Sequence, residues 1–318
     1  MKKTGFLIDD RYVLHKTGDW HPEQPARIAA AFKGVRDSGL LEKISLIKAE
    51  PARQMWIEAV HTIQYIMRFQ EACIAGLPDF DHPDNAICPD TYDIALLAAG
   101  GVLRAVDQVM EGTIDNAFCV VRPPGHHAEK DKAMGFCFFN NIAIAARYLQ
   151  KQWGVKKIGI VDFDVHHGNG TEHAFVNDPT VFYYSIHQHP SFAYPGTGRD
   201  FDRGRGNGYG YTLNSPVLPG RGDAEYKDLF KKDLFPAFEQ FKPDFILTST
   251  GFDAHIDDDM SDINLTTSGY DWVTSKIVEL SDTYSNGKLV SVLEGGYNLM
   301  TLPILVANHI KTLAGIND

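Results

Sequence analysis

The chain has 318 residues, of which 44% are hydrophobic and 22% charged, a composition that excludes a disordered, collagen-like or coiled-coil protein. Acidic residues outnumber basic ones by 41 to 30, and the net charge of −11 argues against nucleic-acid binding and favours cationic partners such as amines or lysine-rich segments. No apolar run approaches the roughly 18 residues of a bilayer span, and Asp9 and Asp10 stand where a signal peptide has its apolar core. The four cysteines lack the paired spacing of a disulfide or metal motif. We therefore expect a cytoplasmic protein without a membrane partner.

Short apolar runs, typical of buried strands, alternate along the chain with longer segments of helical periodicity. The length would also allow two domains, but nothing marks a boundary, so we expect a single α/β domain over residues 1–318 with an open, mostly parallel sheet flanked by helices. The predicted strands lie at 5–8, 44–47, 117–121, 157–161, 181–184, 244–248 and 288–293. The predicted helices lie at 25–37, 92–111, 142–152, 225–241 and 266–284. The segment 187–211 is predicted to be a long irregular loop because it is dense in glycine and charge.

Polar clusters follow five of the predicted strands. In chain order, these clusters are RPPGHH, DFDVHHGNGT, SIHQH, TGFDAH and EGGYN. In open α/β sheets, ligands bind in the crevice outside the carboxyl ends of the strands. We therefore expect these segments, which are far apart in sequence, to converge on one site.

The DFDVH segment is a candidate metal site. If the segment is extended, Asp162, Asp164 and His166 share one face of it. Two carboxylates and an imidazole suit Zn²⁺ and also Fe²⁺, Co²⁺ or Mn²⁺, since no thiolate narrows the choice. Asp253, from another strand end, can supply a third protein ligand. The alternative for the motif alone is a solvated polar strand end, which the companion clusters make less favourable.

His126 and His127 follow the stiff Pro123-Pro124-Gly125 turn, and Tyr297 follows two glycines. One histidine can act as a base while its neighbour, held by a carboxylate, stays cationic, and the tyrosine can donate to an oxyanion. The alternatives are a hydrogen-bonded loop for the histidines and an ordinary turn for the tyrosine.

Aromatic side chains are candidates for the walls of a substrate channel. Phe136, next to Gly135, and Tyr194, which precedes Pro195-Gly196, are the strongest of them, although aromatics near strand ends also form core. We interpret the acidic run 257–259 as a solvated loop face, with attraction of a cationic substrate as the alternative.

Taken together, RPPGHH, GFCFFNN, DFDVHHGNGT, the PGTG at 195–198, GFDAH and LEGGYN, in this order and spacing, resemble the zinc-dependent histone deacetylase superfamily. The resemblance covers nearly the whole chain. HHGNGT and LEGGYN are most similar to the class II branch and to the bacterial deacetylase-like and acetylpolyamine amidohydrolases. The resemblance implies an arginase/deacetylase type of fold with the active site at the carboxyl ends of the strands.

The resemblance also implies a ligand set. It makes Asp164, His166 and Asp253 the zinc ligands and Asp162 the partner of His126, a distinction between the two aspartates that spacing alone does not make.

The resemblance further implies the catalytic groups. His127 would be the general base and then the general acid, with Asn169 as its partner, and Tyr297 would donate to the oxyanion.

Structural potassium is expected from the same resemblance. One ion would be held by Asp162, Ser185 and backbone carbonyls that include those of Asp164, His166 and Ile186. A second would lie near Phe175, Asp178, Val181 and Tyr211.

Two positions depart from the pattern of the superfamily. Gln24 stands where an HPxR pattern would have arginine, with Arg27 as the candidate substitute. Met260 falls at the channel position where polyamine-selective relatives of the class II branch carry a glutamate, which weakens a strict polyamine specificity.

The sequence therefore predicts a zinc-dependent amidohydrolase that cleaves an acetyl amide, with acetyl-lysine in proteins or peptides as the expected substrate and an acetylpolyamine or a small acetamide as the alternative. Two other functions are alternatives: a two-metal ureohydrolase of the arginase type and a non-catalytic binder of acetylated ligands. His255 argues against the ureohydrolase, because it occupies the position where such an enzyme needs a paired aspartate. The sequence is also compatible with a homo-oligomer.

Overall fold

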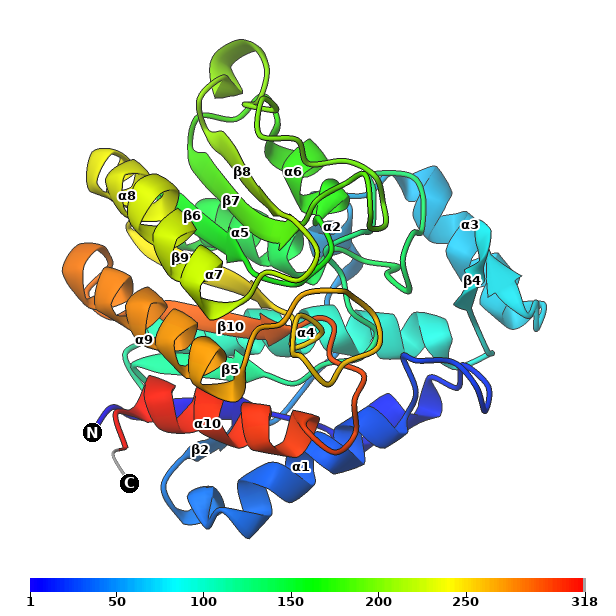
Figure 1. The fold of residues 1–318 in the computed structure, drawn as a ribbon. Helices are drawn as coiled ribbons and strands as arrows, with labels where there is room; N and C mark the ends of the chain where they lie inside the picture. The colour runs from blue at the N-terminus through cyan, green and yellow to red at the C-terminus, as the bar shows by residue number, and fades with distance from the viewer. Residues whose placement is uncertain (317–318) are drawn as a thin grey trace.

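The computed structural model describes residues 1–316, which contain one eight-stranded sheet in the order β2-β1-β5-β10-β9-β6-β7-β8 (Figure 1). Each neighbouring pair of its strands runs parallel, so the predicted fold class is confirmed. The strands are β1 (Thr4–Leu7), β2 (Ser45–Ile47), β5 (Asn116–Cys119), β6 (Ile158–Asp162), β7 (Val181–Gln188), β8 (Thr212–Val217), β9 (Phe245–Thr250) and β10 (Leu289–Leu293). A separate antiparallel hairpin is formed by β3 (Asp79–Phe80) and β4 (His82–Ala86).

Helices cover both faces of the sheet. The layer toward the viewer in Figure 1 consists of α1 (Ala26–Asp37), α7 (Asp223–Leu229), α8 (Phe235–Phe241), α9 (Thr267–Tyr284) and α10 (Leu302–Ala314). The layer behind contains α2 (Gln54–Ile57), α4 (Thr91–Met110), α5 (Asn141–Trp153) and α6 (Asn169–Phe175), and α3 (Ile63–Ile74) packs against α4 beside the sheet. Because both faces are covered, the central strands read as nearly continuous apolar runs and every residue of β6, β9 and β10 is buried.

The loops that leave the carboxyl ends of the central strands carry the polar clusters. They span 120–140 after β5, 163–168 after β6, 251–266 after β9 and 294–301 after β10. Since the strands are parallel and adjacent, these loops emerge along one edge of the sheet, and those after β9 and β10 lie side by side in Figure 1.

Two strand predictions need correction. The strand predicted at 181–184 continues to Gln188, so the polar residues Ser185, His187 and Gln188 lie within β7 rather than after it. Strand β8 was not predicted, because it contains polar residues and Pro216. The proline is tolerated since β8 is an edge strand that pairs only with β7.

The helix predicted at 225–241 is divided into α7 and α8 by a π-helical segment at Phe230–Leu234. Such a π segment is a local change within an otherwise continuous helical run, and the sequence analysis did not detect it. Helices α3 and α10 and the β3–β4 hairpin were also not predicted.

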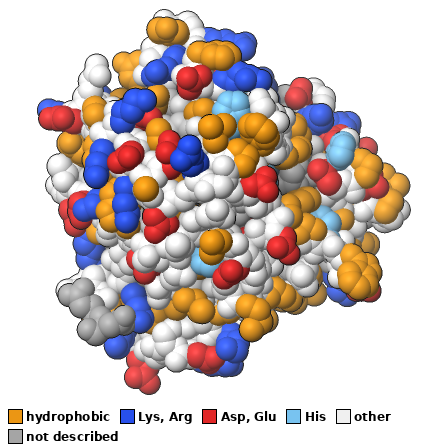
Figure 2. All heavy atoms as spheres, in the orientation of Figure 1, with side chains coloured by type: hydrophobic (Ala, Val, Ile, Leu, Met, Phe, Trp, Pro, Cys, Tyr) orange, Lys and Arg blue, Asp and Glu red, His pale blue; other side chains and the backbone are white. Residues whose placement is uncertain are grey.

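The described residues contain no helix that is long and apolar enough to cross a membrane. On the face shown in Figure 2, acidic and basic side chains are interspersed.

Candidate active site

A pocket of about 220 Å³ opens outside the carboxyl ends of the central strands. It brings together the four predicted channel residues with His127, Tyr297 and His166 of the predicted catalytic and metal-ligating groups, and it also contains Asp84, which sequence reasoning missed. The lining residues are Asp84, His127, Gly135, Phe136, His166, Tyr194, Met260 and Tyr297.

Three side chains converge next to this pocket, and one of them, His166, lines it. One ligand atom from each of Asp164, His166 and Asp253 lies within 4.8 Å of the others, and all three residues are buried. His166 Nδ1 is 3.2 Å from Asp164 Oδ1 and 3.1 Å from Asp253 Oδ2. Among the described residues, this is the one group of His, Cys, Asp and Glu with such convergence.

The structure separates the two aspartates of the DFD segment. Strand β6 ends at Asp162, and residues 164–166 bend instead of continuing the extended alternation that the sequence suggested. The Asp162 carboxylate accepts hydrogen bonds from His126 Nδ1 and from the Tyr183 hydroxyl, each at 3.1 Å. Asp162 therefore lies beneath the cluster, outside the three converging ligands.

The cluster fits a divalent cation chemically. Two carboxylates and one imidazole are ligands that Zn²⁺ accepts, with room for substrate at a further position. Burial alone would lower the pKa of His166, but the carboxylates of Asp164 and Asp253 raise it to about 10. The position between the two carboxylates therefore favours a positive charge. A divalent ion can take the place of that proton.

The carboxylates of the cluster are held in position by the backbone. Gly295 N–H donates to Asp164 Oδ2 at 2.8 Å, and Val165 N–H donates to Asp253 Oδ1 at 3.0 Å. The His166 N–H also donates to Asp164 Oδ1 at 2.9 Å, so the backbone fixes both oxygens of Asp164 and one oxygen of Asp253.

The two adjacent histidines have different electrostatic surroundings. Burial alone would lower the pKa of His126, but Asp164 and Asp162 raise it to about 10. Burial and the neighbouring His126 and His166 lower the pKa of His127 well below its usual value. His126 is therefore a cation near pH 7, whereas His127 is a neutral base whose Nδ1 lies 2.8 Å from Asn169 Oδ1.

Two glycines permit the close approaches around His127. Gly135 has a φ of +54°, and a Cβ there would lie 2.4 Å from Cδ2 of the His127 ring. A Cβ on Gly170 would lie 2.2 Å from the Ala128 carbonyl oxygen, so this glycine lets the first turn of α6, which carries Asn169, pack against the histidine turn.

Arg27, rather than Gln24, braces the loop that carries Tyr297. The Arg27 guanidinium is fully buried, donates to the Gly296 carbonyl at 2.8 Å and to the Glu294 carbonyl at 2.6 Å, and lies 4.9 Å from the centre of the Tyr297 ring. Gln24 is partly exposed. Arg27 therefore braces this loop, although position 24 carries no arginine.

The interpretation of the acidic run 257–259 as a solvated loop face is wrong for Asp258. Its side chain is buried, and its Oδ2 accepts hydrogen bonds from the backbone N–H groups of Tyr297 and Asn298 at 2.6 and 2.9 Å. Burial raises the pKa of Asp258. The charge run gave no signal for this contact, since the partner N–H groups are about 40 residues away in sequence.

Glu294, in the LEGGYN segment, was also missed. Its carboxylate accepts from the N–H groups of Gly125 and His126 at 2.6 and 3.2 Å and from the Ser249 hydroxyl at 3.1 Å. Burial raises the pKa of Glu294 to about 7. Glu294 thus fixes the turn that presents the two histidines.

The first predicted potassium group lies under the metal cluster. Asp162 and Ser185 are paired across neighbouring strands β6 and β7, and Ile186 is the next residue of β7. The Ser185 hydroxyl is 2.8 Å from His187 Nδ1.

The second predicted potassium group lies near the amino end of β7. Phe175 ends α6, Val181 begins β7, and Tyr211 precedes β8. The Asp178 carboxylate is paired with Arg147 at 2.5 Å. Both potassium sites stay predictions.

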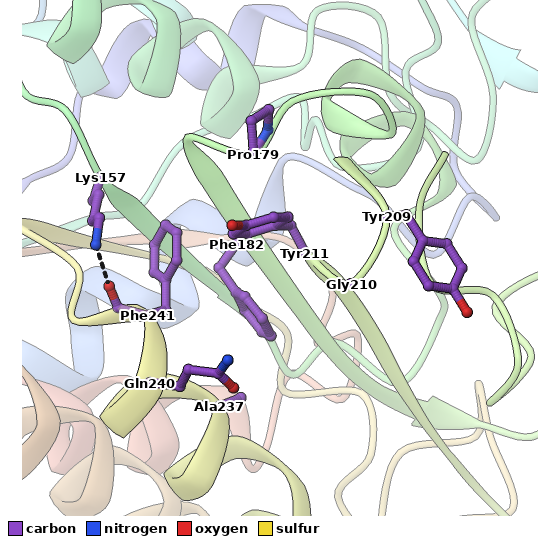
Figure 3. A pocket seen from close by; sticks show the side chains of 9 residues that line it. All are labelled: Lys157, Pro179, Phe182, Tyr209, Gly210, Tyr211, Ala237, Gln240 and Phe241. Atoms are coloured by element: carbon purple, nitrogen blue, oxygen red, sulfur yellow. Dashed lines mark hydrogen bonds between the residues drawn. The ribbon is translucent and has the colours of Figure 1, made fainter. Parts of the chain in front are cut away.

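A second cavity, of about 320 Å³, lies at the opposite, amino-terminal edge of the sheet (Figure 3). Its wall includes aromatic side chains, and the Lys157 ammonium there donates to the Phe241 carbonyl at 3.0 Å. Apart from Lys157, the ionisable groups of its lining are the tyrosines Tyr209 and Tyr211, so we do not place the reaction there.

Comparison with known proteins agrees with this geometry. A family model described as the histone deacetylase domain matches residues 21–313. The chain is 38% identical to a probable deacetylase of Archaeoglobus fulgidus, over 99% of this chain and 87% of that protein. It is 34% identical to a histone deacetylase-like amidohydrolase of Pseudomonas aeruginosa, over 100% of this chain and 87% of that one. The solved HD domain of HDA15 superposes with a TM-score of 0.93 at 34% identity, covering 99% of this chain and 88% of that domain.

The chain belongs to the histone deacetylase family, which confirms the resemblance drawn from its motifs. It is accordingly a hydrolase of the deacetylase and amidohydrolase type.

Proposed function

We propose that the protein is a zinc-dependent deacetylase that hydrolyses acetyl-lysine in proteins or peptides to acetate and the free amine. The observation that carries the proposal is the pocket that is lined by the neutral His127, by Tyr297 and by His166 of the buried Asp164–His166–Asp253 cluster. Zn²⁺ is the proposed ion, and Fe²⁺ or Co²⁺ suit the same ligands.

When bound by these three residues, the ion supplies a Lewis acid for the acetyl carbonyl and lowers the pKa of a water molecule. Asp164 and Asp253 formally balance its two positive charges. The deprotonation of water therefore depends strongly on a base that the protein provides.

His127 is the proposed base. Asn169 holds its Nδ1, which leaves Nε2 to take a proton from the attacking water and then to deliver it to the departing amine. His126, kept cationic by Asp162, stabilises the negative charge that develops during attack.

Tyr297 is the proposed oxyanion donor. It lines the pocket, and burial raises the pKa of its phenol well above the usual value, so the hydroxyl keeps its proton for donation. Arg27 and Asp258 hold its ring and its backbone.

The pocket walls support a linear acyl-amine substrate. Phe136 and Tyr194 are suited to enclose an aliphatic chain, with Gly135 and Met260 completing the wall. Asp84, also in the lining, and the net charge of −11 favour an amine-bearing substrate, which keeps an acetylpolyamine as the second candidate. Met260 offers no charge for a second amine, so we favour acetyl-lysine.

We further propose structural potassium at the two groups described above and activity in the cytoplasm.

The test compares acetate release from an acetyl-lysine peptide and from an acetylated polyamine under identical conditions. We expect a higher kcat/KM for the peptide. A preference for the polyamine would move the proposal to the second candidate, and acetate release from neither substrate would contradict it.

A further inference from the structure

A chain of hydrogen bonds runs from His127 away from the substrate pocket toward the protein surface. His127 Nδ1 lies 2.8 Å from Asn169 Oδ1, and Asn169 Nδ2 donates to Glu129 Oε1 at 2.5 Å. Both carboxylate oxygens of Glu129 accept from His173 Nδ1, at 2.8 and 2.9 Å. The catalytic base is thus linked through two residues to the half-exposed His173.

The orientation of the Asn169 amide decides which tautomer His127 adopts. With the carbonyl oxygen toward His127, Nδ1 must carry the hydrogen, and Nε2 is left with the free lone pair that a base requires. With the amide rotated by 180°, its NH₂ group would face Nδ1. The hydrogen would then belong on Nε2, and His127 could not accept a proton from water at that nitrogen.

Glu129 discriminates between these two orientations. An ionised carboxylate only accepts hydrogen bonds, so it favours the NH₂ group of Asn169 and repels its carbonyl oxygen. The other contacts of Asn169 Nδ2 are longer, 3.3 Å to the His127 carbonyl and 3.7 Å to Met134 Sδ. The strongest constraint on the amide therefore comes from Glu129.

We propose that Glu129 is a positioning residue that, through Asn169, holds His127 in the tautomer competent for base catalysis. The inference rests on the proposed function, because that function makes His127 the base. It adds to the function a residue, Glu129, that is not part of the pocket lining.

The surroundings of Glu129 fit a fixed support. Its backbone carbonyl accepts from His61 Nδ1 at 2.9 Å, and its N–H donates to the Lys132 carbonyl at 2.9 Å. Its side chain borders a separate surface cavity that also contains Lys130, Arg147 and His173. The carboxylate therefore lies on the side of Asn169 that faces away from the substrate.

The first test compares the steady-state kinetics of Glu129→Leu with those of the wild-type protein on an acetyl-lysine peptide. We expect kcat to fall about 10- to 100-fold, the usual cost of losing a group that orients an active-site histidine, while KM stays within about twofold. Glu129→Gln keeps an acceptor oxygen and should lose less. Glu279→Leu removes the same charge from an exposed pair with Lys276 and should leave kcat unchanged.

The second test is a double-mutant cycle with Asn169→Ala. If Glu129 acts through Asn169, Glu129→Leu should lower kcat in the wild-type background and change it less than about twofold in the Asn169→Ala background. Equal losses in both backgrounds would mean that Glu129 acts through general structure, and a wild-type kcat in Glu129→Leu would also overturn the inference.

The third test reads the tautomer without turnover. Nitrogen-15 chemical shifts of histidine in the metal-free protein should show His127 protonated at Nδ1, and a substantial Nε2–H population should appear in Glu129→Leu. An unchanged tautomer would contradict the role of Glu129. If the wild-type protein released no acetate, the proposed function would fail, whereas this measurement would still decide whether Glu129 sets the tautomer.

Discussion

At the scale of single residues, neighbouring side chains of the same type have different properties because their partners differ. His126 contacts Asp162 and is favoured as a cation, whereas His127 contacts the neutral Asn169 and is favoured as a free base. A charge stabiliser next to a proton acceptor is what the hydrolysis of an amide requires.

Tyr297→Phe tests the oxyanion role. The substitution removes only the hydroxyl, and loss of one oxyanion donor typically lowers kcat about 10²- to 10³-fold. Metal content, measured on the same sample, should stay at the wild-type level because the tyrosine is not among the three ligands. Near wild-type turnover in this variant would show that Tyr297 does not donate to the oxyanion.

Asp258→Asn tests whether the loop aspartate positions Tyr297. A single amide oxygen cannot replace both carboxylate oxygens, so at least one of the N–H groups of Tyr297, Asn298 and Met260 loses its acceptor. We expect kcat to fall and the free energy of unfolding to drop by roughly 1–3 kcal/mol.

Asp257→Asn is the matched control for that variant, since the Asp257 side chain is largely exposed. Kinetic assays and urea denaturation of both variants would check the prediction, and equal behaviour of the two would contradict it.

The sequence predicted the residues that now meet in the pocket, because their types and their places after strands carry a signal. It could not predict Asp84, Asp258 or Glu294 as members of the site. Asp258 looked solvated because burial depends on the loop after β10 packing over it, and such a tertiary contact leaves no local pattern.

At the scale of elements, the site depends on contacts between segments that are far apart in sequence. Helix α1 carries Arg27, which binds carbonyls in the loop after β10, and the first turn of α6 packs against the histidine turn after β5. The strands position these loops, and the side chains between the loops set their final arrangement.

Arg27→Met tests the brace between α1 and the loop after β10. The variant leaves the Glu294 and Gly296 carbonyls without this donor and leaves the buried Glu23 with one guanidinium fewer. Breaking a buried ion pair in this way typically costs about 3–5 kcal/mol, so urea denaturation should show a large loss of stability, together with reduced kcat.

Gln24→Ala is the comparison for Arg27→Met, because it changes the partly exposed residue at the departing position of the pattern. We expect its stability and activity to stay close to wild type. If the effects of the two substitutions were reversed, the assignment of the brace to Arg27 would be wrong.

The limits of sequence-based prediction at this scale follow from the sheet. The central strands were predicted because burial on both faces leaves continuous apolar runs, whereas the edge strand β8 contains Pro216 and polar residues. The end of β7 was missed for a different reason: its polar residues Ser185, His187 and Gln188 are buried, but polar residues are typical of a loop in composition.

At the scale of the whole molecule, buried neutral histidines make stability depend on pH. Burial lowers the pKa of His61 to about 4 and that of His309 to about 3. In the unfolded chain a histidine has a pKa near 6.5, so between about pH 6.5 and 4 the unfolded state binds more protons than the folded state. Their contribution to stability is therefore fully present above pH 6.5 and is lost as the pH falls toward the folded-state values.

His309→Gln tests this dependence. Each buried neutral histidine should make the free energy of unfolding fall by about 1.4 kcal/mol per pH unit below pH 6, so urea denaturation from pH 7 to 4.5 should give a smaller pH slope for the variant than for the wild type. His309 lies between the Thr274 and Ser291 hydroxyls, which a glutamine can still contact. Identical slopes would contradict the assignment of a neutral His309.

The most direct test of the central claim is the metal dependence of acetate release from an acetyl-lysine peptide. Activity should be lost when the protein is treated with a chelator and should return on titration with Zn²⁺, reaching its plateau at one ion per chain, because the described residues contain one three-ligand cluster. Activity that survives removal of all metal, or a plateau at two ions per chain, would contradict a single-ion deacetylase and would favour the two-metal alternative in the second case.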